Sequence, residues 1–135
     1  MTYKQKKEIL EQYQNAVHRI KGLQREYEQW ETIATSITQK LSPVNVKSGN
    51  SDKMANAAIK CAEITQEIER EIETAERERM QTKSVINSCS NARHKDILTK
   101  IYINGQSKAT VAKDYDKTWQ SINDVCKTAI TRLNI

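Results

Sequence analysis

Apolar residues recur at alternating intervals of four and three positions along the first part of the chain. The series comprises Ile9, Tyr13, Ala16, Ile20, Leu23, Tyr27, Trp30, Ala34, Ile37 and Leu41. A mean period of about 3.5 residues is that of a coiled-coil seam, and it lasts for more than four heptads here. The pattern therefore predicts one long helix that buries a narrow apolar stripe against a second helix.

A second series with the same period follows a break at Ser42-Pro43, where proline disfavours helical geometry in the residue before it. We expect a loop from Val44 to Asn50, a cap at Asn50 or Ser51, and a helix from Asp52 to Ser88. Two helices of similar length with a short connection fold back on each other. Residues 1–90 are therefore predicted to form a long antiparallel coiled-coil helical hairpin. Its second seam comprises Met54, Ala58, Cys61, Thr65, Ile68, Ile72, Ala75, Arg79, Thr82 and Ile86.

The composition supports an all-α fold and argues against several classes of protein. The chain holds only 3 Gly and 1 Pro, and its hydrophobic fraction of 37% favours narrow seams over a large core. No run approaches the roughly 18 apolar residues of a membrane span, and the polar start suits a cytoplasmic protein. Cys61, Cys89 and Cys126 are far apart and suggest neither a disulfide framework nor a metal site.

The last part of the chain changes in character after about residue 90. Helical spacing is expected over 96–103, 107–115 and 118–133, with Asn104-Gly105 as a turn. Ser107 and Thr118 are the expected caps of the last two helices. The final helix carries an apolar stripe of Ile122, Val125, Cys126, Ala129 and Leu133. A short helix followed at once by a capped amphipathic helix is typical of a helix-turn-helix, which we assign to residues 91–135.

Charge and helix geometry point to double-stranded DNA as the partner of this module. Residues 91–135 contain eight basic and four acidic residues, a net charge of +4, and a positive excess is what phosphate contacts need. Gln and Asn side chains can pair with adenine, Lys can reach guanine or phosphate, and Asp can accept from cytosine. The candidate DNA-binding residues are Lys108, Lys113, Lys117, Thr118, Trp119, Gln120, Ser121, Asn123, Asp124 and Lys127.

Two stretches resemble known families. Ile101-Tyr102-Ile103-Asn104-Gly105, Val111-Ala112 and the segment from Thr118 to Leu133 resemble the promoter-recognition module (region 4) of sigma factors. Trp30 to Ala58, with its Leu41-Ser42-Pro43 and Ser48-Gly49 motifs, resembles small sigma-factor-like phage and prophage regulators of the ArpU/RinA type. This resemblance implies an activator of late phage genes that acts on the nucleoid of a bacterial host cell. RNA polymerase, or a second copy joined through the coiled coil, would be a further partner.

The chain departs from that resemblance at the turn and on the last helix. Asp116 stands where such modules usually carry Gly, and Thr118 stands where they carry a Ser cap. Asp tolerates a left-handed conformation and Thr can cap, so we expect the turn to form. The last helix lacks the arginines typical of sigma factors, which leaves the target sequence open.

Two classes of function remain open. The first is a sequence-specific DNA-binding transcription regulator. The alternative is a protein-interaction adaptor in which the coiled coil binds a partner without DNA. An enzyme is not expected, because the chain has no Gly-rich phosphate loop, no nucleophile with a plausible base and no cluster of metal ligands. We accordingly expect no catalytic residue, metal or cofactor.

Overall fold

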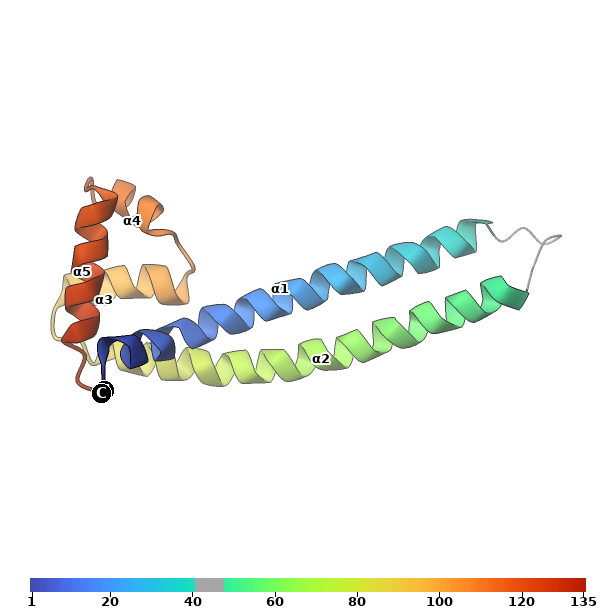
Figure 1. Cartoon of the computed structure of the whole chain (residues 1–135), viewed down its shortest axis with the longest axis horizontal. Coiled ribbons are helices and arrows are strands. Elements are labelled where there is room, and N and C mark those ends of the chain that lie inside the picture. The colour runs from blue at the N-terminus through green and yellow to red at the C-terminus, as the bar shows by residue number, and fades with distance from the viewer. Residues whose placement is uncertain (41–47) are drawn as a thin grey trace. The chain divides into compact units, whose positions relative to one another are not determined.

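The computed structural model describes residues 1–40 and 48–135, with side chains described outside residues 37–51. Helices are the only regular secondary structure in these residues, in agreement with the predicted all-α class (Figure 1). The helices are α1 (Tyr3–Lys40), α2 (Ser48–Asn87), α3 (Ala92–Leu98), the π-helical segment η1 (Thr99–Ile103), α4 (Lys108–Asp114) and α5 (Trp119–Thr131). Within the described residues, no helix combines the length and the apolar character needed to cross a membrane.

The sequence predicts a break at Ser42-Pro43 and a loop from Val44 to Asn50. Residues 41–47 lie outside the described residues, and the loop prediction is wrong for Ser48 to Asn50, which belong to α2. The predicted cap at Asn50 or Ser51 is wrong, because α2 already begins at Ser48. Asp52 consequently lies beyond the first turn, which contains no acidic residue.

The chain divides into two compact units. One consists of residues 18–73, and the other combines residues 1–17 with residues 74–135. The second unit therefore contains the start of α1, the end of α2 and all the shorter helices. The predicted boundary between a coiled-coil hairpin (residues 1–90) and a helix-turn-helix module (residues 91–135) stays a prediction.

The apolar stripe predicted for α1 is the side of that helix that is withdrawn from solvent. Ala16 is fully buried, and all other described positions of the stripe, from Ile9 to Ala34, are half-buried. In residues 18–73, Arg19 of α1 forms an ion pair with Glu71 of α2, with 3.1 Å between Nε and Oε2. The coiled-coil period therefore identified the correct face of α1.

The seam predicted for α2 is wrong at four of its ten positions, because Ala58, Thr65, Ile72 and Arg79 are exposed. The withdrawn positions are instead their preceding neighbours Ala57, Ile64, Glu71 and Glu78. A repeat of apolar residues favours Ile72 over Glu71 at this point of the helix. The structure turns the charged Glu71 toward Arg19 and leaves Ile72 43% exposed.

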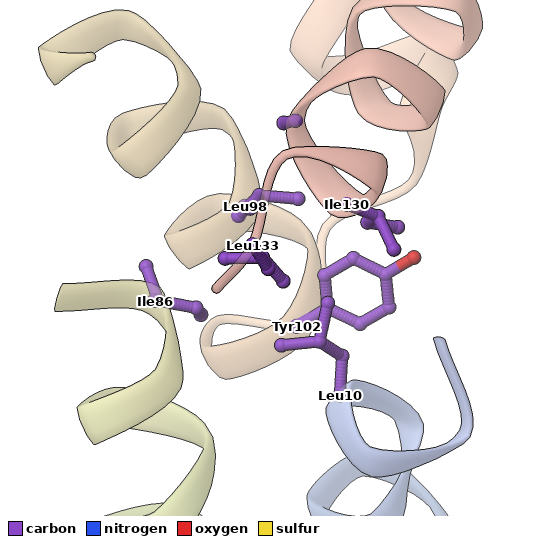
Figure 2. Close-up of a cluster of buried hydrophobic side chains, with 7 residues drawn as sticks. Leu10, Ile86, Leu98, Tyr102, Ile130 and Leu133 are labelled. Carbon is purple, nitrogen blue, oxygen red and sulfur yellow. The ribbon is translucent and has the colours of Figure 1, made fainter. Parts of the chain in front are cut away.

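The unit that combines residues 1–17 with 74–135 has two clusters of buried apolar side chains. One lies under α4 and α5 and consists of Ile97, Val111, Ala112, Ile122 and Cys126. The other joins four helices and η1, and most of its side chains are labelled in Figure 2. It consists of Leu10, Ile86, Leu98, Tyr102, Ala129, Ile130 and Leu133. Leu10 of α1 and Ile86 of α2 are thus part of the core beneath the C-terminal helices.

Three side chains spaced four residues apart on α1 hold the C-terminal helices. Leu10 is fully buried in the cluster described above. Lys6 Nζ donates hydrogen bonds to the carbonyls of Thr131 (3.0 Å) and Leu133 (2.7 Å), where a cation is favourable at the C-terminal end of α5. Gln14 Nε2 donates to the carbonyls of Tyr102 (3.3 Å) and Ile103 (3.0 Å) at the end of η1. We call Lys6, Leu10 and Gln14 the α1 clamp.

The clamp predicts that truncation of Leu10 destabilises the C-terminal helices. Leu10→Ala should lower the free energy of unfolding by about 2–5 kcal/mol, because it leaves a cavity in a packed core. Ile33→Ala, at a 43% exposed position of α1, serves as the control and should change stability by less than about 0.5 kcal/mol. Denaturant unfolding followed by circular dichroism measures both, and equal effects of the two variants would contradict the clamp.

Thr82 of α2 is a polar residue at a fully buried position. It is 0% exposed, and its Oγ1 has no hydrogen-bond partner among the residues that the structure describes. A buried hydroxyl without a partner loses its hydration and gains nothing in return. The site therefore carries an avoidable cost in stability.

Thr82→Val should accordingly raise the free energy of unfolding by about 1 kcal/mol, because valine has nearly the same shape and needs no partner. Thr65→Val is the matched control, since Thr65 is exposed and its hydroxyl already donates to the Cys61 carbonyl at 2.8 Å. A loss of stability in the Thr82 variant, measured by the same unfolding assay, would show that this hydroxyl does find a partner in solution.

Candidate nucleic-acid interface

Helix α4 begins at a cap that the sequence predicted. Ser107 has an extended backbone and its Oγ accepts a hydrogen bond from the Thr110 amide at 3.1 Å. The helix then buries Val111 and Ala112 in the cluster beneath α5. This packing leaves Lys113 on the exposed side of α4.

The segment between α4 and α5 consists of residues 115–118. Asp116 adopts a positive φ of 54°, the left-handed conformation that was expected to be tolerable for Asp at this position. The Lys117 amide donates to the Ala112 carbonyl at 2.8 Å, which satisfies a carbonyl at the end of α4. Backbone hydrogen bonds and one left-handed residue thus fix the turn.

Thr118 caps the start of α5, and its Oγ1 accepts a hydrogen bond from the Ser121 amide at 3.1 Å. This confirms the predicted cap. Ile122, Cys126 and Ala129 are buried, as the stripe predicted. The stripe omitted Ile130, which is 0% exposed because it faces the cluster that contains Leu10.

The opposite side of α5 is exposed to solvent. At about 100° per residue, positions 120, 124, 127 and 131 share this side, and Gln120, Asp124, Lys127 and Thr131 are all exposed. Gln120 Nε2 donates to Asp124 Oδ1 at 3.0 Å. We call Gln120, Asp124 and Lys127 the outer face of α5.

Three candidate residues meet at the flank of α5. Lys108 Nζ, from the first turn of α4, donates to Asn123 Oδ1 at 2.7 Å. The same ammonium lies 5.7 Å from the centre of the Trp119 ring, within the range of a cation–π interaction. Trp119 remains 51% exposed. The interaction therefore ties the start of α4 to the first turns of α5 through a polar contact as well as the apolar core.

The remaining candidate residues differ in their exposure to solvent and in whether they interact with other side chains. Lys113, Lys117 and Lys127 are exposed, and within the described part of the chain none of them forms an ion pair or a side-chain hydrogen bond. Ser121 is half-buried and supplies its amide to the cap. The three lysines therefore present uncompensated positive charge, as phosphate contacts require.

A polar cluster that the sequence analysis did not identify lies beside the turn. The Tyr115 hydroxyl donates a hydrogen bond to Asp96 Oδ2. Lys100 Nζ lies 3.5 Å from the same carboxylate oxygen and 4.9 Å from the Tyr115 ring centre, and Arg93 lies 5.4 Å from that centre. The only available signal was the recurrence of polar residues on 93–100, which is equally typical of a solvated helix.

Burial, together with the hydrogen bond to Asp96, raises the pKa of Tyr115 to about 12. Burial likewise raises the pKa of the Cys126 thiol and of the Cys89 thiol. These groups therefore stay protonated at neutral pH. Among the described residues, no group of His, Cys, Asp and Glu side chains is placed to hold a metal ion.

The chain matches no known protein family, no curated protein and no solved structure.

The raised pKa of Tyr115 predicts a specific loss of stability in alkali. The neutral phenol is favoured in the folded state, so its contribution is fully present below the unfolded pKa of about 10. It is lost as the pH rises through the folded value of about 12. Wild type should therefore lose more stability than Tyr115→Phe over this interval, as measured by denaturant unfolding. Parallel pH profiles of the two proteins would mean that the Tyr115 phenol has an ordinary pKa.

Proposed function

We propose that the chain is a sequence-specific DNA-binding transcription regulator. In this proposal α4 and α5 form a helix-turn-helix, α5 enters the major groove, and the lysines beside it contact phosphates. The double-stranded duplex is then the principal partner.

The observation that carries the proposal is the composition of the outer face of α5. Ile122, Cys126 and Ala129 face the core, so the side that carries Gln120, Asp124 and Lys127 is available to a partner. Amide, carboxylate and ammonium groups are those that contact base edges in the major groove. Free ammonium groups at Lys113 and Lys117 add the positive charge that attracts a polyanion.

The turn between the helices gives a second line of support. A capped helix directly after a short helix is the arrangement in which a helix-turn-helix presents its second helix. The left-handed Asp116 and the Thr118 cap make this connection without Gly. The departures from the sigma-factor pattern at these two positions are thus compatible with the proposed motif.

For α1 and α2 we propose an antiparallel coiled-coil hairpin that engages a second copy of the chain or RNA polymerase. The apolar stripe of α1, which is half-buried or buried along its described length, and the Arg19–Glu71 pair support this arrangement. The resemblance to ArpU/RinA-type regulators supports the narrower proposal that the regulated genes are late genes of a phage or prophage.

The proposal predicts salt-sensitive binding that depends on α5. The full chain should bind random-sequence duplexes with an affinity that falls linearly with salt on logarithmic axes. Lys127→Ala should weaken binding to a selected duplex by about 1–3 kcal/mol without a change in thermal stability. Fluorescence anisotropy of a labelled duplex over a salt series measures both effects.

Lys53→Ala is the matched control, because Lys53 is also an exposed lysine but belongs to α2 and to residues 18–73. It should leave duplex affinity unchanged. A chain that shows no salt-dependent binding to any duplex would contradict DNA binding and favour the protein-interaction adaptor.

A further inference from the structure

We infer that the Gln120–Asp124 pair selects cytosine at one position of the DNA site. This inference rests on the proposed function and specifies the base that the outer face of α5 recognises. In this inference, the side chains of Gln120 and Asp124 together accept a hydrogen bond from the base.

The orientation of the pair follows from the chemistry of its hydrogen bond. An ionised carboxylate can only accept, so the group of Gln120 that faces Asp124 must be its NH₂ group. The contact is Nε2 to Oδ1 at 3.0 Å. The carbonyl oxygen Oε1 of Gln120 and the second oxygen of Asp124 are then left as acceptors for a partner.

A pair of acceptors with a negative charge discriminates among the four bases. In the major groove, guanine presents two acceptors, thymine one acceptor and a methyl group, adenine one acceptor beside an amino group, and cytosine an amino group alone. The Asp124 carboxylate repels the acceptors of guanine, thymine and adenine. Cytosine presents only the donor N4 in the major groove, with no acceptor of the same base beside the carboxylate. Cytosine is therefore the base that the pair favours.

The Lys108–Asn123 contact has the reverse polarity and lies on the flank of α5. Lys108 can only donate, so the oxygen of Asn123 is held toward Nζ at 2.7 Å and its NH₂ group is left for a partner. Because this contact is half-buried and its neighbour is the exposed Trp119 ring, it orients the first turns of α5. Gln120 and Asp124 therefore lie on a helix whose first turns are held in place by this contact.

Selection of bound duplexes from a random pool tests the inference. The full-length wild type and the variant Asp124→Asn are selected in parallel, and Asp114→Asn is the control. Asp114 is an exposed carboxylate at the last position of α4, so the control removes the same charge from the same module but leaves the α5 pair intact. Melting temperatures of all three proteins establish that each is folded.

We expect the wild-type motif to contain a position at which cytosine is preferred over other bases by about 5- to 150-fold, the usual range for a good base contact. Asp124→Asn should lose this preference, with adenine gaining because an amide offers one acceptor and one donor. Asp114→Asn should recover the wild-type motif.

Three results would overturn the inference while leaving DNA binding intact. They are a motif that is the same in wild type and Asp124→Asn, a wild-type preference for another base at the position that Asp124→Asn alters, and an equal change in Asp114→Asn. A pool that yields no enriched motif, together with no salt-dependent duplex binding, would instead contradict the proposed function and the inference with it.

Discussion

The contact between the α1 clamp and the C-terminal helices is the interaction on which the rest of the structure depends. Leu10 fills the core between η1 and α5, while Lys6 and Gln14 satisfy carbonyls at the ends of those elements. Gly105 shows how closely the parts fit. It has a φ of +72°, and a Cβ at this position would lie 3.0 Å from Gln14 Oε1. The candidate interface is therefore supported by a helix that begins more than a hundred residues before it, since α1 starts at Tyr3 and α4 at Lys108.

The turn between α4 and α5, together with the helix caps, fixes the orientation of α5. Asp116 supplies the left-handed step, Thr118 starts the helix, and Lys108 adds a hydrogen bond from α4 to Asn123. With Ile122 and Cys126 fixed in the core, the outer face can point in only one direction relative to α4. A fixed direction is what a helix needs in order to place side chains against base edges.

Local signals predicted most of the C-terminal helices, and non-local packing accounts for the errors. Ser107 and Thr118 were identified as caps because capping depends on residues three positions apart. Leu10 was not assigned to a core, because it lies beside the coiled-coil stripe and its partners are distant in sequence. Ile130 was missed for the same reason. The seam predicted for α2 is wrong at Ile72, because the neighbouring Glu71 is turned toward Arg19 and forms an ion pair with it. The spacing of apolar residues gives no sign of such an ion pair.

We propose that the outer face of α5 contacts DNA, and an NMR titration of the full chain with a selected duplex tests this proposal through the backbone amide shifts. We expect the largest changes on Gln120, Asp124, Lys127 and the neighbouring Lys117, while Ile33 and Ile59, exposed on α1 and α2, stay unchanged. Changes confined to α1 and α2, with α5 unaffected, would contradict it.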